Sequence, residues 1–290
     1  MSDDALFKHE PYVRLAAFVV ALVLISVWES LKPRRVRVAS RTRRTVNNLF
    51  LAAINAACVR VLPAVSAVSA AQWAAQSHMG ALNWVRGPAW LKVVAALIVL
   101  DLVIYAQHVV VHRVPVLWRI HRVHHADLDL DATSGLRFHP VEILLSMGVK
   151  VVAVALLGAT PLTVILFEIG LNASSIFNHG NIHLPHRLDR LLRLVVVTPD
   201  MHRVHHSVCP DETNSNFGFN LSWWDGVFKT YRAQPRNPQD TLELGLSELR
   251  TESETVPVWV MLAMPFRTKV PIVRDRAAVL VDERSRDNTE

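Results

Sequence analysis

The sequence feature that most limits the fold is a pair of matched histidine sets, each placed at the end of an apolar stretch. The first set lies in Asp101–His125 and has the spacing H-x3-H followed by H-x2-H-H, and the second set repeats it. Imidazole nitrogens clustered in this way are typical metal ligands. The chain must therefore fold so that two distant segments meet. The ten histidines are His108, His112, His121, His124, His125, His179, His183, His202, His205 and His206.

The spacing within each set predicts how the metals are shared. Histidines four residues apart lie on one face of a helix, where both reach the same ion. In H-x2-H-H, we expect the pair three apart to share an ion and the adjacent histidine to serve a second one. Two sets of five thus predict a centre for two metal ions. Imidazole binds iron, zinc, copper and nickel. Among these metals, iron is the one expected if the centre oxidises a hydrocarbon at a membrane surface. The isolated His9, His78 and His186 are expected to be structural.

Composition places the chain in a membrane. Of its 290 residues, 51% are hydrophobic, and the mean hydropathy is +0.25. Such a balance indicates several spans. We expect an all-α polytopic membrane helical bundle, of about four spans or of two spans plus a hairpin, with a cytoplasmic histidine-rich di-metal cap. The expected apolar segments are Tyr12–Leu31, Val46–Ala70, Trp90–Val111 and the arms Val141–Leu157 and Pro161–Phe177 of a hairpin that crosses the membrane or re-enters it.

Charge predicts the orientation. The loop Lys32–Arg44 carries seven positive charges and no negative one, which places it in the cytoplasm and the N-terminus outside. With this orientation, the number of expected spans predicts that both histidine sets lie on the cytoplasmic face. We expect the membrane to be a bacterial inner membrane. The net charge of +6 is therefore attributed to membrane orientation, and no nucleic-acid partner is expected. Two distant cysteines, Cys58 and Cys209, provide neither a disulfide framework nor a zinc ribbon.

Several polar residues accompany the histidines. Asp101 and Tyr105 fall on the same helix face as His108 and His112. An acid within a span needs a partner. We expect Asp101 to accept a hydrogen bond from Tyr105 or from a histidine of another segment, or to pair with a lysine or backbone group.

Other metal proteins fit the pattern less well. A zincin protease needs H-E-x-x-H, and no such run occurs. A non-redox zinc protein remains an alternative, either a hydrolase or a metal carrier. A hydrolase would need a carboxylate base, for which Glu142 is the only near candidate, and a carrier would place its ligands along a path inside the membrane. A catalytically dead scaffold is disfavoured because no ligand is missing.

The motifs together resemble a known family, the fatty acid hydroxylase/sterol desaturase superfamily of integral membrane di-iron oxidases. The matching pieces are DLVIYAQHVVVH, LWRIHRVHH, RFHPVE, NHGNIH, TPDMHRVHHS and SNFGFNLSWWDGVFKTY, which cover Asp101–Tyr231 in the family's order. The resemblance implies that two irons use dioxygen and external electrons to hydroxylate or desaturate a lipid, with the ten histidines as ligands. It also implies that His139 supports the ligands or is an occasional ligand. We expect Asn178 and Asn181, which flank a ligand, to hydrogen-bond a ligand or a metal-bound water, and Asn216 and Asp225 to be structural.

The resemblance also bears on partners and on domain organisation. The substrate is expected to be a lipid entering from the bilayer. Some relatives carry a fused cytochrome b5-type haem domain with a His-Pro-Gly-Gly run, which is missing from this sequence, so a separate ferredoxin, cytochrome or reductase is expected. A pterin-dependent ether-lipid monooxygenase shares the histidine pattern and stays an alternative. The expected divisions are a membrane region with the basic loop (1–92), the catalytic region (93–235) and a cytoplasmic C-terminal segment with a charged tail (236–290).

Overall fold

The computed structural model describes residues 3–61 and 66–267, and within those ranges the chain forms helices, turns and isolated bridges but no strand. The long helices are α1 (Asp3–Leu31), α2 (Arg41–Arg60), α5 (Ala89–Arg113), α7 (Pro140–Leu157) and α8 (Pro161–His179). The shorter ones are α3 (Ala67–Gln76), α4 (Ala81–Trp84), α6 (Pro115–His125), η1 (Ser134–Leu136), α9 (His186–Leu192), α10 (Pro199–His205), α11 (Pro210–Thr213), α12 (Trp223–Val227), α13 (Glu252–Thr255), α14 (Val258–Ala263) and η2 (Met264–Phe266).

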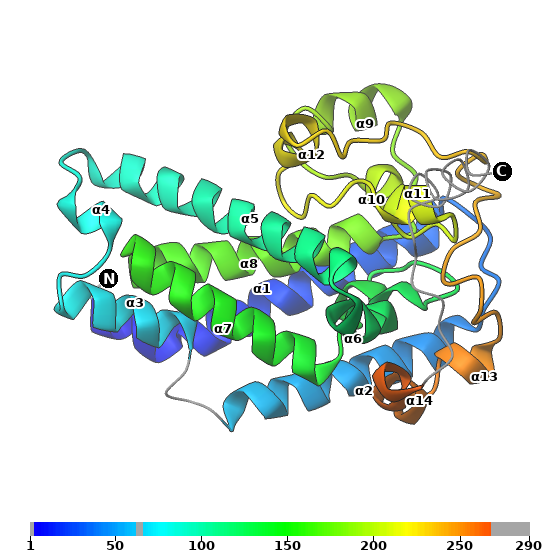
Figure 1. Cartoon of the computed structure of the whole chain (residues 1–290), viewed down its shortest axis with the longest axis horizontal. Coiled ribbons are helices and arrows are strands. Elements are labelled where there is room, and N and C mark those ends of the chain that lie inside the picture. The colour runs from blue at the N-terminus through cyan, green and yellow to red at the C-terminus, as the bar shows by residue number, and fades with distance from the viewer. Residues whose placement is uncertain (1–2, 62–65, 268–290) are drawn as a thin grey trace, which may run out of the picture.

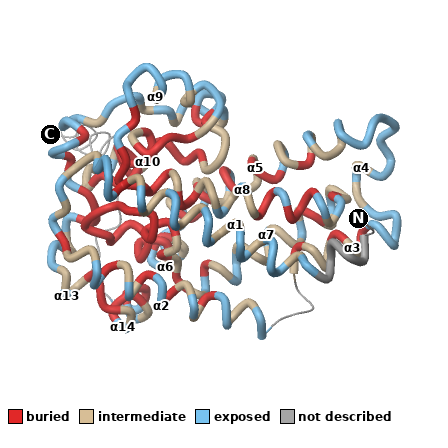
Figure 2. Tube along the Cα trace, turned by 180° about the vertical axis from the view of Figure 1, so that it is seen from behind, coloured by how far each residue is buried: buried red, intermediate tan, exposed pale blue. Residues whose placement is uncertain are grey.

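The long helices lie roughly along the long axis of the molecule (Figure 1). The short helices α6 and α9–α14 gather at one end of it, whereas α3 and α4 lie at the other end (Figure 1). Among the described residues, four helices are long and apolar enough to cross a membrane: His9–Leu31 of α1, and α5, α7 and α8. The end that holds α6 and α10 is the most deeply buried part of the chain (Figure 2). The expected all-α polytopic membrane bundle with a histidine-rich cap is thus confirmed, and the chain is an integral membrane protein.

The expected span over residues 46–70 is not one apolar helix. In its place α2 ends at Arg60 and α3 begins at Ala67, and α2 is not among the helices suited to cross a membrane. The reason is its polar face, since α2 buries Arg44, Asn48 and Asn55 against the rest of the protein. The chain therefore leaves the cap in two shorter helices, α2 and then α3 (Figure 1).

The hairpin of α7 and α8 forms as expected. Gly158 ends α7 with φ +71°, a left-handed conformation in which glycine avoids the strain of a side chain. The side chain of Thr160 then caps α8 by accepting from the backbone of Thr163. At about 1.5 Å per residue, each arm is close to the thickness of a bilayer core. Both arms pack with α3 and α5 around a cluster that includes Leu100, Val154 and Phe167.

The cap is joined to α2 by a buried charge network. Arg44 donates from Nε to Asp127 Oδ1 at 2.7 Å and from Nη1 to Asp131 Oδ2 at 2.6 Å, and all three side chains are at most 1% exposed. Burial by itself would raise the pKa of Asp127, but the charges of Arg44 and Arg137 lower it to about 2. The network fixes the segment that connects α6 to α7, and with it the histidines of α6.

The C-terminal part of the described chain packs onto the cap. Val260, Met261 and Met264 join Leu51 and Trp118 in a buried cluster, so the short apolar segment of α14 is a packed element and not a span. The charged tail that begins at Asp282 lies outside the described residues.

Candidate metal centre

Nine of the ten expected histidines converge in two adjacent groups. Within each group the potential ligand atoms all lie within 4.8 Å of one another. The groups touch, because the rings of His125 and His206 stack with centroids 4.4 Å apart. The first group consists of His108, His112, His121, His125 and His205, and the second of His124, His179, His202 and His206.

Helical periodicity sorts the histidines between the groups. In the H-x2-H-H motif of α6, His121 and His125 belong to the first group and His124 to the second. In the motif of α10 the sharing is reversed, with His202 and His206 in the second group and His205 in the first. The structure therefore pairs the histidines four apart, where the sequence led us to expect the pair three apart. Residues four apart lie more nearly in line along a helix, so each motif serves both groups.

His183 is the expected ligand that the structure leaves outside both groups. Helix α8 ends at His179, so the four-residue spacing to His183 is no longer helical. The following segment is extended and bridges to Pro33. Ile182 is fully buried there, and His183 is exposed, its ring centroid 6.4 Å from that of His186.

The hydrogen bonds of the rings show what the groups can bind. His108 Nδ1 lies 2.8 Å from the Phe217 carbonyl, and His205 Nδ1 lies 2.8 Å from the Ser215 carbonyl. A carbonyl only accepts, so each Nδ1 carries the proton and each Nε2 carries a lone pair. Yet the two Nε2 atoms lie 3.1 Å apart. Two lone pairs at this distance repel, and a cation bound between them removes the repulsion.

The second group has the same character. His179 Nδ1 lies 2.7 Å from the Ser175 carbonyl, so its Nε2 also carries a lone pair. That atom faces His124 Nε2 at 3.0 Å and His202 Nε2 at 3.1 Å. Several further ring nitrogens are buried without a hydrogen-bond partner, among them His112 Nε2 and His125 Nε2. Both groups therefore fit a metal ion.

Burial also keeps these histidines in the form that binds metal. It lowers the pKa of His205 to about 3. It likewise lowers the pKa values of His124, His125, His202 and His206 well below the ordinary range, and neighbouring histidines lower them further. Neutral imidazole is the ligand form, so these five histidines can bind metal near neutral pH without first losing a proton.

Glu142 orients one of the candidate ligands, a role that sequence reasoning missed. Its Oε1 lies 2.6 Å from His121 Nδ1, and Glu142 is only 7% exposed. A carboxylate on Nδ1 fixes the tautomer and makes Nε2 a stronger donor to a metal. The sequence signal was the RFHPVE motif, but its glutamate was considered only as a possible hydrolase base.

We expect Glu142→Gln to lower metal affinity about 10–100-fold, as is usual for a lost partner of a ligand histidine. The amide keeps the size of the side chain and removes the charge. Metal content after graded chelation measures the effect. Glu243→Gln, an exposed glutamate of the cap, is the control, and equal metal retention by both variants would contradict the role of Glu142.

Asp101 binds backbone groups, which is one of the alternatives expected for it, together with two side chains, whereas Tyr105 binds Thr230 and not Asp101. The Asp101 carboxylate accepts from Asn220 Nδ2 at 2.7 Å, from the Leu221 backbone at 3.1 Å and from Trp224 Nε1 at 2.8 Å. Tyr105 shares a hydrogen bond of 2.8 Å with Thr230. These contacts hold the segment around α12 against α5, and that segment supplies the Phe217 carbonyl that binds His108.

The remaining polar residues of the motifs also support the cap. His139 caps α7 by accepting from the Val141 backbone and lies outside both histidine groups. Asn178 donates to the Phe219 carbonyl at 2.7 Å. Asn181 binds the backbone of Arg35 through both ends of its amide.

The two later residues are structural, as expected. Asn216 has a positive φ of 52° and donates to the Met201 and Arg232 carbonyls. The Asp225 carboxylate accepts from the Phe217 and Gly218 backbones at 2.8 Å each. Together they shape the turn that presents the carbonyl to His108.

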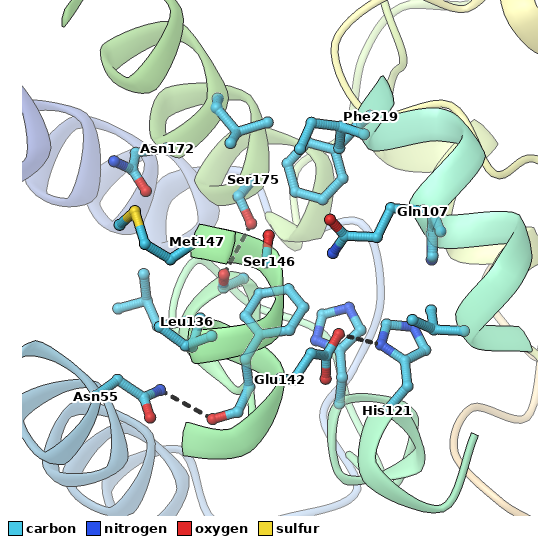
Figure 3. Close-up of a pocket in the computed structure, with 18 of the residues that line it drawn as sticks. Asn55, Gln107, His121, Leu136, Glu142, Ser146, Met147, Asn172, Ser175 and Phe219 are labelled. Atoms are coloured by element: carbon cyan, nitrogen blue, oxygen red, sulfur yellow. Dashed lines mark hydrogen bonds and ion pairs between the residues drawn. The ribbon is translucent and has the colours of Figure 1, made fainter. Parts of the chain in front are cut away.

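A cavity of about 240 Å³ opens beside the histidines on the membrane side, bordered by His108, His121 and His124. Its walls come from α2, α5, α7 and α8 and from the segment around η1, and Figure 3 shows its side chains. The residues facing it include Gln107, Glu142, Ser146 and Phe219. A pocket between spanning helices at a metal cluster can present part of a lipid to the metals.

Comparison with known proteins gives consistent matches. The fatty acid hydroxylase family matches residues 93–230. An ornithine lipid hydroxylase of Rhizobium tropici is 28% identical over 261 residues, which are 87% of this chain and 75% of that protein. Cholesterol 25-hydroxylases are 30% identical over 168 residues in Mus musculus and 28% identical over 170 residues in Rattus norvegicus. The chain spans about half the length of those two relatives, 55% and 56%. No solved structure matches the chain.

The fold and the cluster define a class: a polytopic helical membrane protein whose cap holds histidines suited to metal. Within that class, residues 93–230 carry a fatty acid hydroxylase domain, and the matched relatives are lipid hydroxylases of the fatty acid hydroxylase/sterol desaturase superfamily. The chain is an oxidoreductase that acts on lipids, and the resemblance seen in its motifs is confirmed.

Proposed function

We propose that the protein is a di-iron, dioxygen-dependent lipid hydroxylase whose ligands are the nine histidines of the two groups. The observation that carries the proposal is the pair of Nε2 lone pairs of His108 and His205, 3.1 Å apart and each fixed by a carbonyl on the opposite nitrogen. Bound iron would supply the activation of dioxygen that oxidation of a C–H bond requires. The matched relatives are named as hydroxylases, which favours hydroxylation over desaturation.

The balance of the reaction defines the partners. One C–H bond and one O2, with two electrons and two protons, give one C–OH bond and one water. The electrons come from a separate donor, such as a ferredoxin, cytochrome or reductase. The protein's residues would hold the ions, orient the ligand rings and keep bulk water away from a cluster in which every histidine except the half-buried His112 is buried. The substrate is a bilayer lipid, and ornithine lipid is the first candidate because that relative matches 87% of the chain.

We place the cap and the basic loop in the cytoplasm, with the N-terminus on the other side of a bacterial inner membrane. The basic loop contacts the cap, because Arg34 pairs with Asp200 at 3.3 Å and Arg44 binds Asp127. The start of α1 lies at the far end of the bundle (Figure 1). The proposed divisions remain a membrane region (1–92), the catalytic region (93–235) and a C-terminal segment (236–290).

Metal analysis joined to turnover tests this function. We expect protein purified from iron-rich cells to carry about two irons per chain and, with a reductant and an electron carrier, to consume dioxygen as ornithine lipid gains one oxygen atom. Heat-treated protein with the same iron added is the control. The result that would count against the proposal is purified protein that carries only zinc and that still consumes no oxygen after its zinc is exchanged for iron. That result would favour a non-redox zinc protein.

A further inference from the structure

The cavity beside the histidines is more polar than an alkyl chain requires. Helix α7 presents Glu142, Ser146 and Lys150 to it at intervals of four residues, which places them on one helix face. Helix α8 presents Asn172 and Ser175 from the opposite wall. Polar side chains inside a span are costly and face the bundle interior when they serve a function. This row of polar side chains on α7 runs toward His121, so it would contact the part of the lipid that approaches the metals.

The cavity contains unpaired hydrogen-bond acceptors. Glu142 Oε2, Gln107 Oε1 and Asn55 Oδ1 are buried without a partner, and all three residues line the cavity. Glu142 and Asn55 are each 7% exposed. In Figure 3 the Gln107 amide points into the space, and the Glu142 carboxylate lies beside His121. A buried acceptor left unpaired is unfavourable, so these atoms favour a ligand that donates hydrogen bonds.

The charges restrict that donor to a neutral group. Lys150 Nζ is held by Glu168 Oε1 at 2.7 Å, and Arg14 Nη2 binds Glu168 Oε2 at 2.8 Å. The lysine is therefore not free to bind an anionic headgroup. At the other end of the cavity, two metal cations would repel an ammonium group. An amide N–H or a hydroxyl satisfies the acceptors without either conflict.

The adjoining groove accounts for the apolar part of the lipid. A second space of about 380 Å³ shares Gln107, Val111 and Glu142 with the cavity. Apart from Gln107 and Glu142, its walls are apolar and include Val110 and Leu145, which are 46% and 49% exposed on the lipid-facing surface. An acyl chain fits this groove, with the polar part of the molecule directed inward.

We propose that the cavity binds a neutral hydrogen-bond donor of the substrate, an amide N–H or a hydroxyl, on Gln107, Glu142 and Asn55. The oxidised carbon then lies within a few bonds of that donor, and not at the far end of an acyl chain. This inference rests on the proposed lipid hydroxylation and adds the substrate class and the position of the new hydroxyl.

The test uses the full chain, loaded with iron, in phosphatidylcholine vesicles with a reductant and an electron carrier. The probes are ornithine lipid and its analogue methylated on the amide nitrogen, which loses the N–H and keeps the acyl chain. The total polar lipid extract of the source cells is treated in parallel. Tandem mass spectrometry locates each added oxygen atom, and we expect it within a few bonds of an N–H or O–H group.

Gln107→Met removes an acceptor that has no partner in the protein and preserves side-chain size. We expect kcat/KM for the N–H probe to fall about fivefold to tenfold, the usual worth of one hydrogen bond, and to change less than about twofold for the methylated probe. The melting temperature should not fall, because no contact is lost. Gln76→Met, an exposed glutamine of α3, is the matched control and should behave like the unmodified protein with both probes.

The outcomes separate the two proposals. Oxygen added only to remote acyl carbons would overturn the inference and leave the hydroxylase intact. An equal loss with both probes in Gln107→Met would also overturn it, because the amide would then serve a water or proton path common to all substrates. Oxygen added to no lipid, in the probes or in the extract, would overturn the proposed function itself.

Discussion

A His205→Ala protein is expected to lose metal from the first histidine group and to lose lipid hydroxylation by more than about 100-fold. Loss of a residue that only hydrogen-bonds a metal ligand already lowers metal affinity or activity about 10–100-fold. His205 is itself a proposed ligand, so its loss should have a larger effect. Its Nε2 faces that of His108 at 3.1 Å. The measurements are the metal content per chain and the rate of product formation by purified protein.

His183→Ala is the matched comparison, since His183 belongs to the same histidine set in the sequence but is exposed and outside both groups. We expect it to keep both metals and its full rate. If His183→Ala also lost metal, a ligand set of ten would replace the nine proposed from the geometry. If His205→Ala kept two metals, the assignment of the first group would be wrong.

The second large effect is expected from Arg44→Met, which should lower the free energy of unfolding by about 3–5 kcal/mol. The substitution leaves the buried carboxylates of Asp127 and Asp131 without the guanidinium that neutralises them. The segment between α6 and α7 should loosen, so metal should also be released at lower chelator concentration. Denaturant unfolding in detergent and the chelation curve measure the two effects.

Arg43→Met provides the control at the neighbouring position. Arg43 is 61% exposed and pairs with Glu252 at the surface, so its removal should cost at most about 1 kcal/mol. Adding Asp127→Asn to Arg44→Met should recover part of the lost stability, because it removes one uncompensated charge. Equal stability of the Arg43 and Arg44 variants would show that the network does not support the cap.

Much of the fold was predictable because membrane helices leave strong local signals. The arms of the hairpin and the spans at Tyr12 and Trp90 were recognised from length and apolar composition alone, since the bilayer core requires about 20 apolar residues. The prediction of a span over residues 46–70 was wrong for a reason that is not local. Arg44 and Asn48 in α2 are buried against residues more than 80 positions away, and hydropathy does not record such partners.

The candidate site, like the fold, was predictable from the sequence only in part. The histidine spacings by themselves indicated a metal cluster and identified its candidate ligands, because imidazoles at helical intervals are a local property of the sequence. Tertiary structure decided which histidines share a group, that His183 lies outside, and that Glu142 binds His121 across 21 positions. These facts depend on where helices end and how they pack. The end of α8 at His179 and the contact of α6 with α7 arise from the whole fold, which no spacing within one motif specifies.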